Sequence, residues 1–200
     1  MKQKIQLALF TGMILFTLVS SAQPDAGTLT IGGGLSLDFQ NNKQENGSIT
    51  VDQGNTNVTS FTPLIGYFFL DGFAGGLAVN YIRSRFKTDD DTETTINRSF
   101  TVGPFLKYYH ESGFFGMANI GFGSGKFKFE DTEFPDNNTE ADRSVTDWRI
   151  GGGYAYFFND HISIEPMISY GGQTAKFDGT DIKDINNSFR FSVGFALFLD

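Results

Sequence analysis

The sequence predicts an all-β protein, an eight-stranded antiparallel up-and-down transmembrane β-barrel. Apolar residues alternate with small or polar residues along most of the chain, which is the period of a strand with one apolar face. Aromatic residues gather at both ends of the alternating segments, and the 200 residues include 23 Phe and 24 Gly. Short turns alternate with long polar connections. A soluble core of this size would rely more on Leu, Ile and Val.

The N-terminal segment has the pattern of a secretory signal peptide. Lys2 and Lys4 are followed by the apolar stretch 5–19 and by the small residues Ser20, Ser21 and Ala22. This stretch is shorter than the roughly 20 residues of a transmembrane helix, although an uncleaved anchor is the alternative. We therefore expect a Sec signal peptide at 1–22, cleaved after Ala22, and one barrel domain at 23–200.

Eight segments after this leader alternate as strands do. The last is the clearest, because Phe191, Val193 and Phe195 share one face while Ser192 and Gly194 share the other. An even number of strands places the first and last strand ends on the same side of a barrel. The segments are 29–39, 61–69, 73–81, 99–108, 118–123, 147–158, 162–170 and 188–199.

The connections between these segments fall into two classes. Short turns are predicted at 70–72, 110–113 and 159–161, and Gly72 can adopt the positive φ of a tight turn. Long polar loops are predicted at 40–57, 87–95, 130–144 and 178–187. Outer-membrane barrels have short periplasmic turns and long extracellular loops. The asymmetry therefore predicts the outer membrane of a Gram-negative bacterium, with both termini periplasmic.

Aromatic residues form two predicted bands, as at the two interfaces of a membrane barrel. The first band lies beside the short turns and comprises Tyr67, Phe68, Phe69, Phe73, Tyr108, Tyr109, Phe114, Phe115, Tyr154, Tyr156, Phe157 and Phe158. The second lies near the loops and comprises Phe39, Phe61, Tyr81, Phe100, Trp148, Tyr170 and Phe189.

A soluble lipocalin-type barrel or a sandwich has the same alternation. In either case the face opposite the apolar one would be exposed to water. Here that face consists mostly of Gly, Ser, Thr, Ala and Asn, which suits the inside of a narrow barrel. Pro63, Pro104 and Pro166 fall within strands on the lipid-facing side. Since proline cannot donate to the ladder, we predict a local bulge at each.

Six charged residues are predicted to face the lumen, three of each sign. Lys107 and Glu165 lie at matching depths beside short turns. Buried charges need partners because desolvation costs several kcal/mol per ion. We therefore predict a structural charge network that plugs the lumen, with a gate or narrow conduction path as the alternative. The network comprises Asp38, Lys107, Asp147, Arg149, Glu165 and Arg190.

The leader, the eight segments and the last strand at 191–199 together resemble small bacterial outer-membrane β-barrel proteins. The chain looks like the Bacteroidetes-type outer membrane protein beta-barrel domain and, more distantly, the OmpA membrane domain. The resemblance covers 23–200 and rests on pattern. It implies outer-membrane lipid and lipopolysaccharide as surroundings and the barrel-assembly machinery as a partner in biogenesis. In that family the last strand usually ends in an aromatic residue, whereas this chain ends with Leu199 and Asp200.

Most chemical functions find no support in the sequence. The absence of cysteine excludes disulfides, cysteine zinc sites and thiol nucleophiles. The net charge of −8 argues against nucleic-acid binding. The stretch 121–126 has glycines and a lysine but not the spacing of a phosphate loop. The acidic loops lack the spacing of an EF-hand, although clustered carboxylates make calcium conceivable. We predict no metal ligand and no cofactor.

One esterase-like constellation merits consideration. His161, Ser163 and Glu165 resemble the triad of outer-membrane lipid A deacylases. However, His161 lies at a periplasmic turn, whereas the acyl chains to be cut lie in the outer leaflet. Turn formation and lumen filling explain these residues, and we predict no catalytic residue.

Two functions remain. The first is a non-enzymatic structural or surface-interaction role through long acidic extracellular loops, whose partner the sequence does not name. The alternative is OmpW-like transport of small hydrophobic molecules across the outer membrane. A continuous apolar tunnel with a side opening would favour transport, and a lumen closed by the charged set would favour the first role.

Overall fold

The computed structural model describes residues 23–46, 49–88, 92–179 and 183–200, and the side chains of these except 38–46 and 49–54. The predicted signal peptide lies outside them. In the described residues no helix is long and apolar enough to cross a membrane. The elements are β1 (Leu29–Asn46), β2 (Ile49–Leu70), β3 (Phe73–Lys87), β4 (Glu93–Tyr109), β5 (Phe114–Asp131), η2 (Pro135–Asn137), β6 (Thr139–Tyr154), β7 (Tyr156–Asn159), β8 (Ile162–Phe177) and β9 (Lys183–Leu199).

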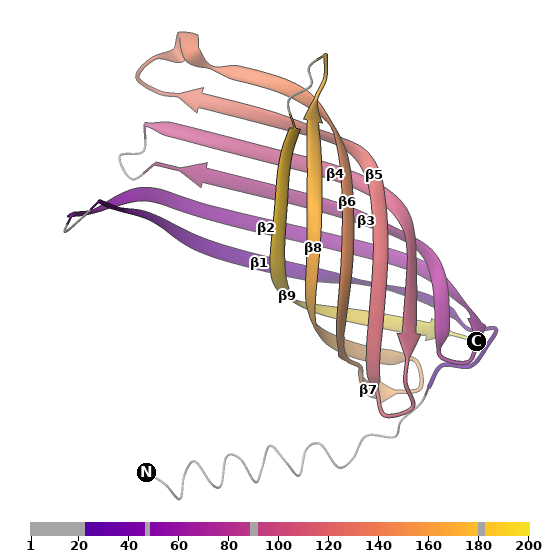
Figure 1. The fold of residues 1–200 in the computed structure, drawn as a ribbon. Helices are drawn as coiled ribbons and strands as arrows, with labels where there is room; N and C mark the ends of the chain where they lie inside the picture. Colours follow the sequence, from indigo (N-terminus) through magenta and orange to yellow (C-terminus); the bar gives the residue numbers. More distant parts are fainter. Residues whose placement is uncertain (1–22, 47–48, 89–91, 180–182) are drawn as a thin grey trace, which may run out of the picture.

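The strands form one antiparallel sheet that closes on itself (Figure 1). Strands β1 to β6 pair in chain order, β6 pairs with β8, and β9 joins β8 to β1. The short β7 continues the line of β6 after Ala155, whose backbone N–H donates to the Gly113 carbonyl at 2.8 Å. This bond continues the β5–β6 register by one residue, so the interruption between β6 and β7 lies on the side that faces β8. The predicted eight-stranded barrel is confirmed, with its sixth strand divided in two.

The alternation of side chains matches the prediction. On β4 each odd position from Ser99 to Tyr109 is buried and each even position from Phe100 to Tyr108 is exposed. Large apolar side chains such as Leu77 and Leu106 are more than half exposed on the outer face. Small and polar residues such as Ser60 and Thr101 are buried inside. This inside-out arrangement suits a hydrocarbon surrounding, because exposing so many apolar side chains to water is unfavourable.

Two long connections are largely strand rather than loop, contrary to the prediction. The predicted loop 40–57 is a continuation of β1 and β2, which stay paired as far as Asn46↔Ile49. Likewise β6 begins at Thr139, inside the predicted loop 130–144. Both faces of these extensions can meet water, so their sequences are polar throughout and lack an apolar period. The barrel therefore continues as paired hairpins beyond its apolar belt (Figure 1).

The three strand prolines lie without bulges, so that prediction is wrong. Beside Pro104 the β4–β5 ladder passes from Val102↔Phe122 to Phe105↔Asn119 in unchanged register. The same two-pair gap lies beside Pro63 on β2 and beside Pro166 on β8. A residue without an N–H leaves the ladder locally unbonded, but no residue is inserted, so the register survives.

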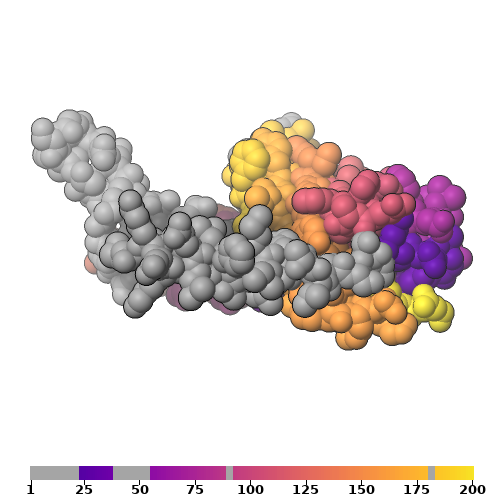
Figure 2. Space-filling model, turned by 90° about the horizontal axis from the view of Figure 1, so that it is seen from below, coloured from indigo at the N-terminus to yellow at the C-terminus, as the bar shows by residue number. Residues whose placement is uncertain are grey.

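The short-turn end of the barrel is held by the residues that precede β1. The Gly72 N–H donates to the Pro24 carbonyl at 2.9 Å, and the Gly27 N–H donates to the Phe68 carbonyl at 2.8 Å. The Thr28 hydroxyl donates to the Asp200 carboxylate at 3.0 Å. Figure 2 shows the indigo residues, which include this segment, beside purple and yellow parts of the chain. The segment 23–28, here called the N-terminal strap, therefore ties the β2–β3 turn to the end of β9.

The closing contact between the first and last strands is short. Strands β1 and β9 pair over seven residues each, from Leu29↔Leu199 to Leu35↔Val193. Beyond this point β1 stays paired with β2 and β9 stays paired with β8, which carries the two edges apart (Figure 1). Within the described strands no ladder joins 36–46 to 183–192. We call this stretch, where the two strands are not paired with each other, the seam.

Candidate functional site

The short-turn end of the lumen is filled by aromatic rings. Phe68, Tyr109 and Phe198 are each at most 1% exposed, and their rings pack in tilted and edge-to-face pairs with centroids 5.8 to 6.1 Å apart. Phe115 and Phe157 complete the cluster, here called the aromatic plug. The predicted aromatic band beside the short turns is thus only partly correct: Phe68, Tyr109, Phe115 and Phe157 point into the barrel. Their outward neighbours, such as Phe69 and Phe114, face the surroundings as expected.

A charged cluster lies on top of the plug. The Lys107 ammonium donates to the Glu165 carboxylate at 2.5 Å, and both residues are at least 94% buried. The hydroxyls of Tyr109 and Ser163 donate to the other Glu165 oxygen, at 2.5 and 3.1 Å. The Lys107 nitrogen also lies 4.3 Å from the centre of the Phe115 ring. The carboxylate thus has three donors, which offset its desolvation.

A second buried carboxylate, Asp147, is held by neutral donors. The Asn80 amide donates to one Asp147 oxygen at 3.0 Å, and the Thr101 hydroxyl donates to the other. Thr62 in turn donates to Asn80 at 3.2 Å, which links β2, β3, β4 and β6 across the lumen. These bonds satisfy the carboxylate without a direct ion pair.

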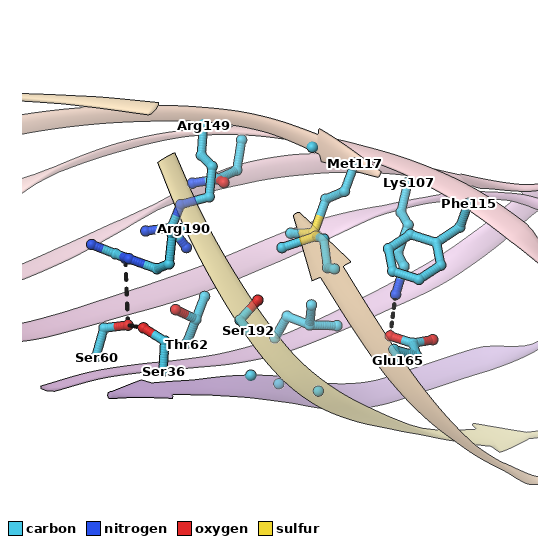
Figure 3. A pocket seen from close by; sticks show the side chains of 17 residues that line it. Ser36, Ser60, Thr62, Lys107, Phe115, Met117, Arg149, Glu165, Arg190 and Ser192 are labelled. Atoms are coloured by element: carbon cyan, nitrogen blue, oxygen red, sulfur yellow. Dashed lines mark hydrogen bonds and ion pairs between the residues drawn. The ribbon is translucent and has the colours of Figure 1, made fainter. Parts of the chain in front are cut away.

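A small cavity of about 50 Å³ lies above the Lys107–Glu165 pair. Arg149 and Arg190 project into one end of it, and Lys107, Phe115 and Glu165 lie at the other (Figure 3). Arg190 donates to Ser60 at 3.4 Å, and Ser60 shares a 2.6 Å hydrogen bond with Ser36. The rest of the lining is mostly small: Gly33, Gly34, Thr62, Gly151, Ser192 and Gly194, with Leu64, Met117, Asn119 and Met167.

Arg143 crosses the end of the lumen that lies opposite the short turns. Its guanidinium donates to Asp184 at 3.2 Å and to Asn97 at 2.6 Å, and it lies 5.3 to 5.7 Å from the ring centres of Phe127 and Phe177. The sequence interpretation missed Arg143 because it placed 130–144 in a loop. Strand alternation could have identified it. Arg143 lies four residues, an even number, before Asp147, so the two side chains lie on the same face of the strand.

Five of the six predicted lumen charges lie in the interior, namely Lys107, Asp147, Arg149, Glu165 and Arg190. The side chain of Asp38 lies outside the described part of the structure. Among the described residues the five do not form one network. Lys107 and Glu165 pair closely, Asp147 is held by amide and hydroxyl groups, and the charges of Arg190 and Asp147 act on Arg149 without an ion pair.

The esterase-like constellation is not assembled. The Ser163 hydroxyl donates directly to Glu165 inside the barrel, while His161 is exposed at the turn between β7 and β8. The backbone N–H of His161 donates to Asn159 at 2.9 Å, as in a turn. The described residues also contain no group of three or more His, Asp or Glu placed to hold a metal ion.

The outer hairpin of β5 and β6 is ordered by its acidic residues. Asp131 accepts the backbone N–H groups of Glu133 and Phe134, both at 2.9 Å, and so fixes the turn that leads into η2. On the exposed strand surface a hydrogen bond to Glu140 raises the pKa of Lys126 above its ordinary value. Lys128 donates to Glu130 and thereby lowers the pKa of that carboxyl. The acidic residues of this hairpin are thus partly neutralised, and Asp131 gives its tip a defined structure.

Comparison with known proteins identifies a family and a fold. The family described as "Outer membrane protein beta-barrel domain" matches residues 11–196. The attachment invasion locus protein Ail of Yersinia pestis, solved with the heparin analogue sucrose octasulfate, is similar at 20% identity and a TM-score of 0.50. The match covers 87% of this chain and 99% of Ail.

Two further solved structures are similar at low identity. The β domain of the Bordetella autotransporter BrkA has 14% identity and a TM-score of 0.51, covering 86% of this chain and 69% of that one. The outer membrane protein OprG of Pseudomonas aeruginosa has 15% identity and a TM-score of 0.43, covering 89% and 98%. No curated protein sequence matches the chain.

Proposed function

The chain belongs to the outer membrane protein beta-barrel domain family and lies in the outer membrane of a Gram-negative bacterium, and from this premise we propose that it is a closed, non-enzymatic barrel that presents its outer hairpins for surface interactions. The apolar outer face contacts outer-membrane lipid and lipopolysaccharide, and the barrel-assembly machinery inserts it. The short turns and the N-terminal strap face the periplasm.

The observation that supports this role best is the filled lumen. The aromatic plug occupies the short-turn end, and Lys107 and Glu165 form a salt bridge directly above it. A steady aqueous path would require both to move. Breaking a buried ion pair costs about 3–5 kcal/mol, so an open state built this way is rare. The wall is therefore a support, and recognition falls to the segments beyond it.

The β5–β6 hairpin suits such a role because hydrogen bonds fix its tip. Strands of 15 to 22 residues, such as β3 and β2, exceed the 9–11 residues that cross a bilayer. Asp131 and η2 shape the β5–β6 tip, where Phe134 is 62% exposed among acidic residues. An exposed ring within a fixed acidic tip gives a partner both an apolar anchor and a charge to oppose.

Planar-bilayer recording tests the closed wall. The purified full-length protein is expected to give no stable open-channel steps, whereas Phe115→Ala with Phe198→Ala, which removes two rings of the plug, is expected to give them. Phe69→Ala with Phe114→Ala is the matched control, since these rings face outward. Stable steps from the unmodified protein would overturn the proposal.

The barrel has only part of the geometry that transport of small hydrophobic molecules requires. The seam is the stretch of the wall without a β1–β9 ladder, and that function requires a side opening there. However, the cavity next to it is lined largely by polar and small residues, and the plug separates it from the short-turn end. A continuous apolar tunnel is absent from the described residues, so we do not advance transport across the membrane.

A further inference from the structure

Three arginines lie just beyond the aromatic residues on the outer face of β3 and β4. On β3 Arg83 follows Tyr81 by two residues, and on β4 Arg98 precedes Phe100 by two residues. In the β3–β4 ladder Tyr81 pairs with Phe100. One outward-facing position further along, Arg83 pairs with Arg98. Arg85 follows on the same face of β3, and all three arginines are exposed. We call Arg83, Arg85 and Arg98 the arginine patch.

The strand register places like charges directly opposite each other. Arg83 pairs with Arg98 across β3 and β4, and Arg98 pairs with Lys126 across β4 and β5. Like charges in directly opposed positions destabilise a sheet. Lys126 is neutralised, because its ammonium lies 3.3 Å from the Glu140 carboxylate and 3.6 Å from that of Asp142. The repulsion that remains lies between Arg83 and Arg98.

Arg83 and Arg98 have no ion-pair partner among the described residues. The described side chains of β2, β3 and β4 include one carboxylate, Glu93, which lies five residues from Arg98 at the hairpin end of β4. The charge of Arg85 acts on Glu130, whose carboxylate already accepts from a lysine. An anion from outside the chain would therefore relieve the repulsion between the two paired guanidinium groups.

The depth of the arginine patch in the membrane follows from the rings beside it. Aromatic rings at the ends of barrel strands lie at the level of the lipid headgroups. Arg83 and Arg98 lie two residues, about 7 Å along a strand, beyond such rings. An arginine stem covers apolar surface while its guanidinium meets polar groups. With the hairpins outward, the anionic groups at this level are the phosphates of lipopolysaccharide in the outer leaflet.

We propose that Arg83 and Arg98 together bind one phosphate group of the lipid A part of lipopolysaccharide, with Arg85 as a third donor. A guanidinium group donates two parallel hydrogen bonds to a phosphate, which a lysine cannot do. The acyl chains of the same lipid lie over Leu77 and Val102, which are exposed on the bilayer side of the rings. This site rests on the proposed function, which places the long hairpins at the cell exterior.

Titration of the full-length protein in a neutral detergent with bisphosphorylated lipid A tests the proposal, with native mass spectrometry counting the bound lipid molecules. The double variant Arg83→Gln with Arg98→Gln is expected to weaken binding at least about tenfold, because charge-assisted hydrogen bonds to the phosphate are lost. An unchanged affinity of this variant would contradict the assignment.

A second cross-strand pair of cations supplies a matched control. Lys176 on β8 pairs with Lys183 on β9, and both are exposed. They lie six residues beyond the rings of Tyr170 and Phe189, about 20 Å along the strands and past the headgroups. Lys176→Gln with Lys183→Gln removes the same charge and is expected to leave lipid A binding unchanged. An equal loss in both double variants would show attraction by net charge alone and would remove the role of the arginine patch.

Two further ligands separate the phosphate from the rest of the lipid. Lipid A without phosphates keeps the sugars and the acyl chains. It is expected to bind at least about tenfold more weakly, and equally well to the unmodified protein and to the arginine double variant. Inorganic phosphate at millimolar concentration is expected not to displace lipid A. Displacement by inorganic phosphate would show a free oxyanion site instead of a lipid site.

Failure of this proposal is distinguishable from failure of the proposed function. Stable open-channel steps in planar bilayers would contradict the closed barrel without changing the binding of lipid A. If the arginine double variant fails to fold, the single variants Arg83→Gln and Arg98→Gln decide in its place. Each is expected to weaken lipid A binding, and an unchanged affinity in both would refute the role of the arginine patch.

Discussion

Neutralising Glu165 tests how much the buried Lys107–Glu165 pair contributes to the free energy of unfolding. Its carboxylate accepts from Lys107, Tyr109 and Ser163, and Glu165 is almost fully buried. Glu165→Gln keeps the shape and an acceptor oxygen but leaves the Lys107 ammonium without a counter-charge. Lys107→Met leaves the carboxylate without its cation but with both hydroxyl donors. The double variant removes both charges together.

The structure gives an order for the three effects on the free energy of unfolding. Glu165→Gln leaves an unpaired buried cation and is expected to cost about 3–5 kcal/mol. Lys107→Met is expected to cost less, about 2–3 kcal/mol, because charge-assisted hydrogen bonds from Tyr109 and Ser163 still stabilise the anion. The double variant is expected to lie within about 1 kcal/mol of the unmodified protein, because neutral replacement of a buried pair is often harmless. The coupling energy is then at least about 4 kcal/mol.

Urea titration in phosphatidylcholine vesicles measures these values through the fluorescence of Trp148, the only tryptophan of the chain. Trp148 lies on the outer face and far along β6 from the cluster, so the variants leave the reporter itself unchanged. Additive effects of the two single substitutions, with a coupling energy under about 1 kcal/mol, would refute the buried-pair reasoning.

Three further predictions concern the surface, the plug and the orientation. Lys126→Ala is expected to leave the urea midpoint unchanged, because its ion pairs with Glu140 and Asp142 are exposed to water; a lowered midpoint would contradict this. Phe198→Ala is expected to lower the free energy of unfolding by about 3–5 kcal/mol, as for a buried ring, whereas a cost near zero would show that the plug is loosely packed. Protease added to intact cells is expected to cut at 132–138, and cutting there only after the outer membrane is permeabilised would reverse the assigned orientation.

The sequence alone predicted the strand number and the facing of most side chains, because alternation records directly which face meets hydrocarbon. It failed where both faces of a strand meet water, as in the extensions of β1 and β2, since a polar strand and a polar loop then look alike. It also grouped the rings near the short turns into one interfacial band, although several of them face the lumen. Paired rings such as Phe68 and Phe69 carried the missing signal, because adjacent strand residues must face opposite sides.

The candidate site was partly accessible in the same way. The alternation of strand residues placed Lys107, Arg149 and Glu165 inside the barrel. Lys107 and Glu165 both lie beside short turns, which predicted that they meet. The partners of Asp147 were not accessible, because they depend on which of four strands lie across the lumen from one another. The seam was equally out of reach, since the separation of β1 from β9 depends on how the whole sheet spreads.

The short closing contact between β1 and β9 also constrains the order in which the chain folds. Thr28 and Asp200 are 172 positions apart, yet they bond to each other at the barrel's end. The other neighbouring strands, by contrast, are joined by hairpins that close cheaply. Loop closure over so long a distance is the most costly entropic step, so the open sheet forms first and the ring closes last. Because this last step gains only seven residue pairs, its rate is set by the search of the two ends of the chain for each other rather than by the formation of any single hairpin.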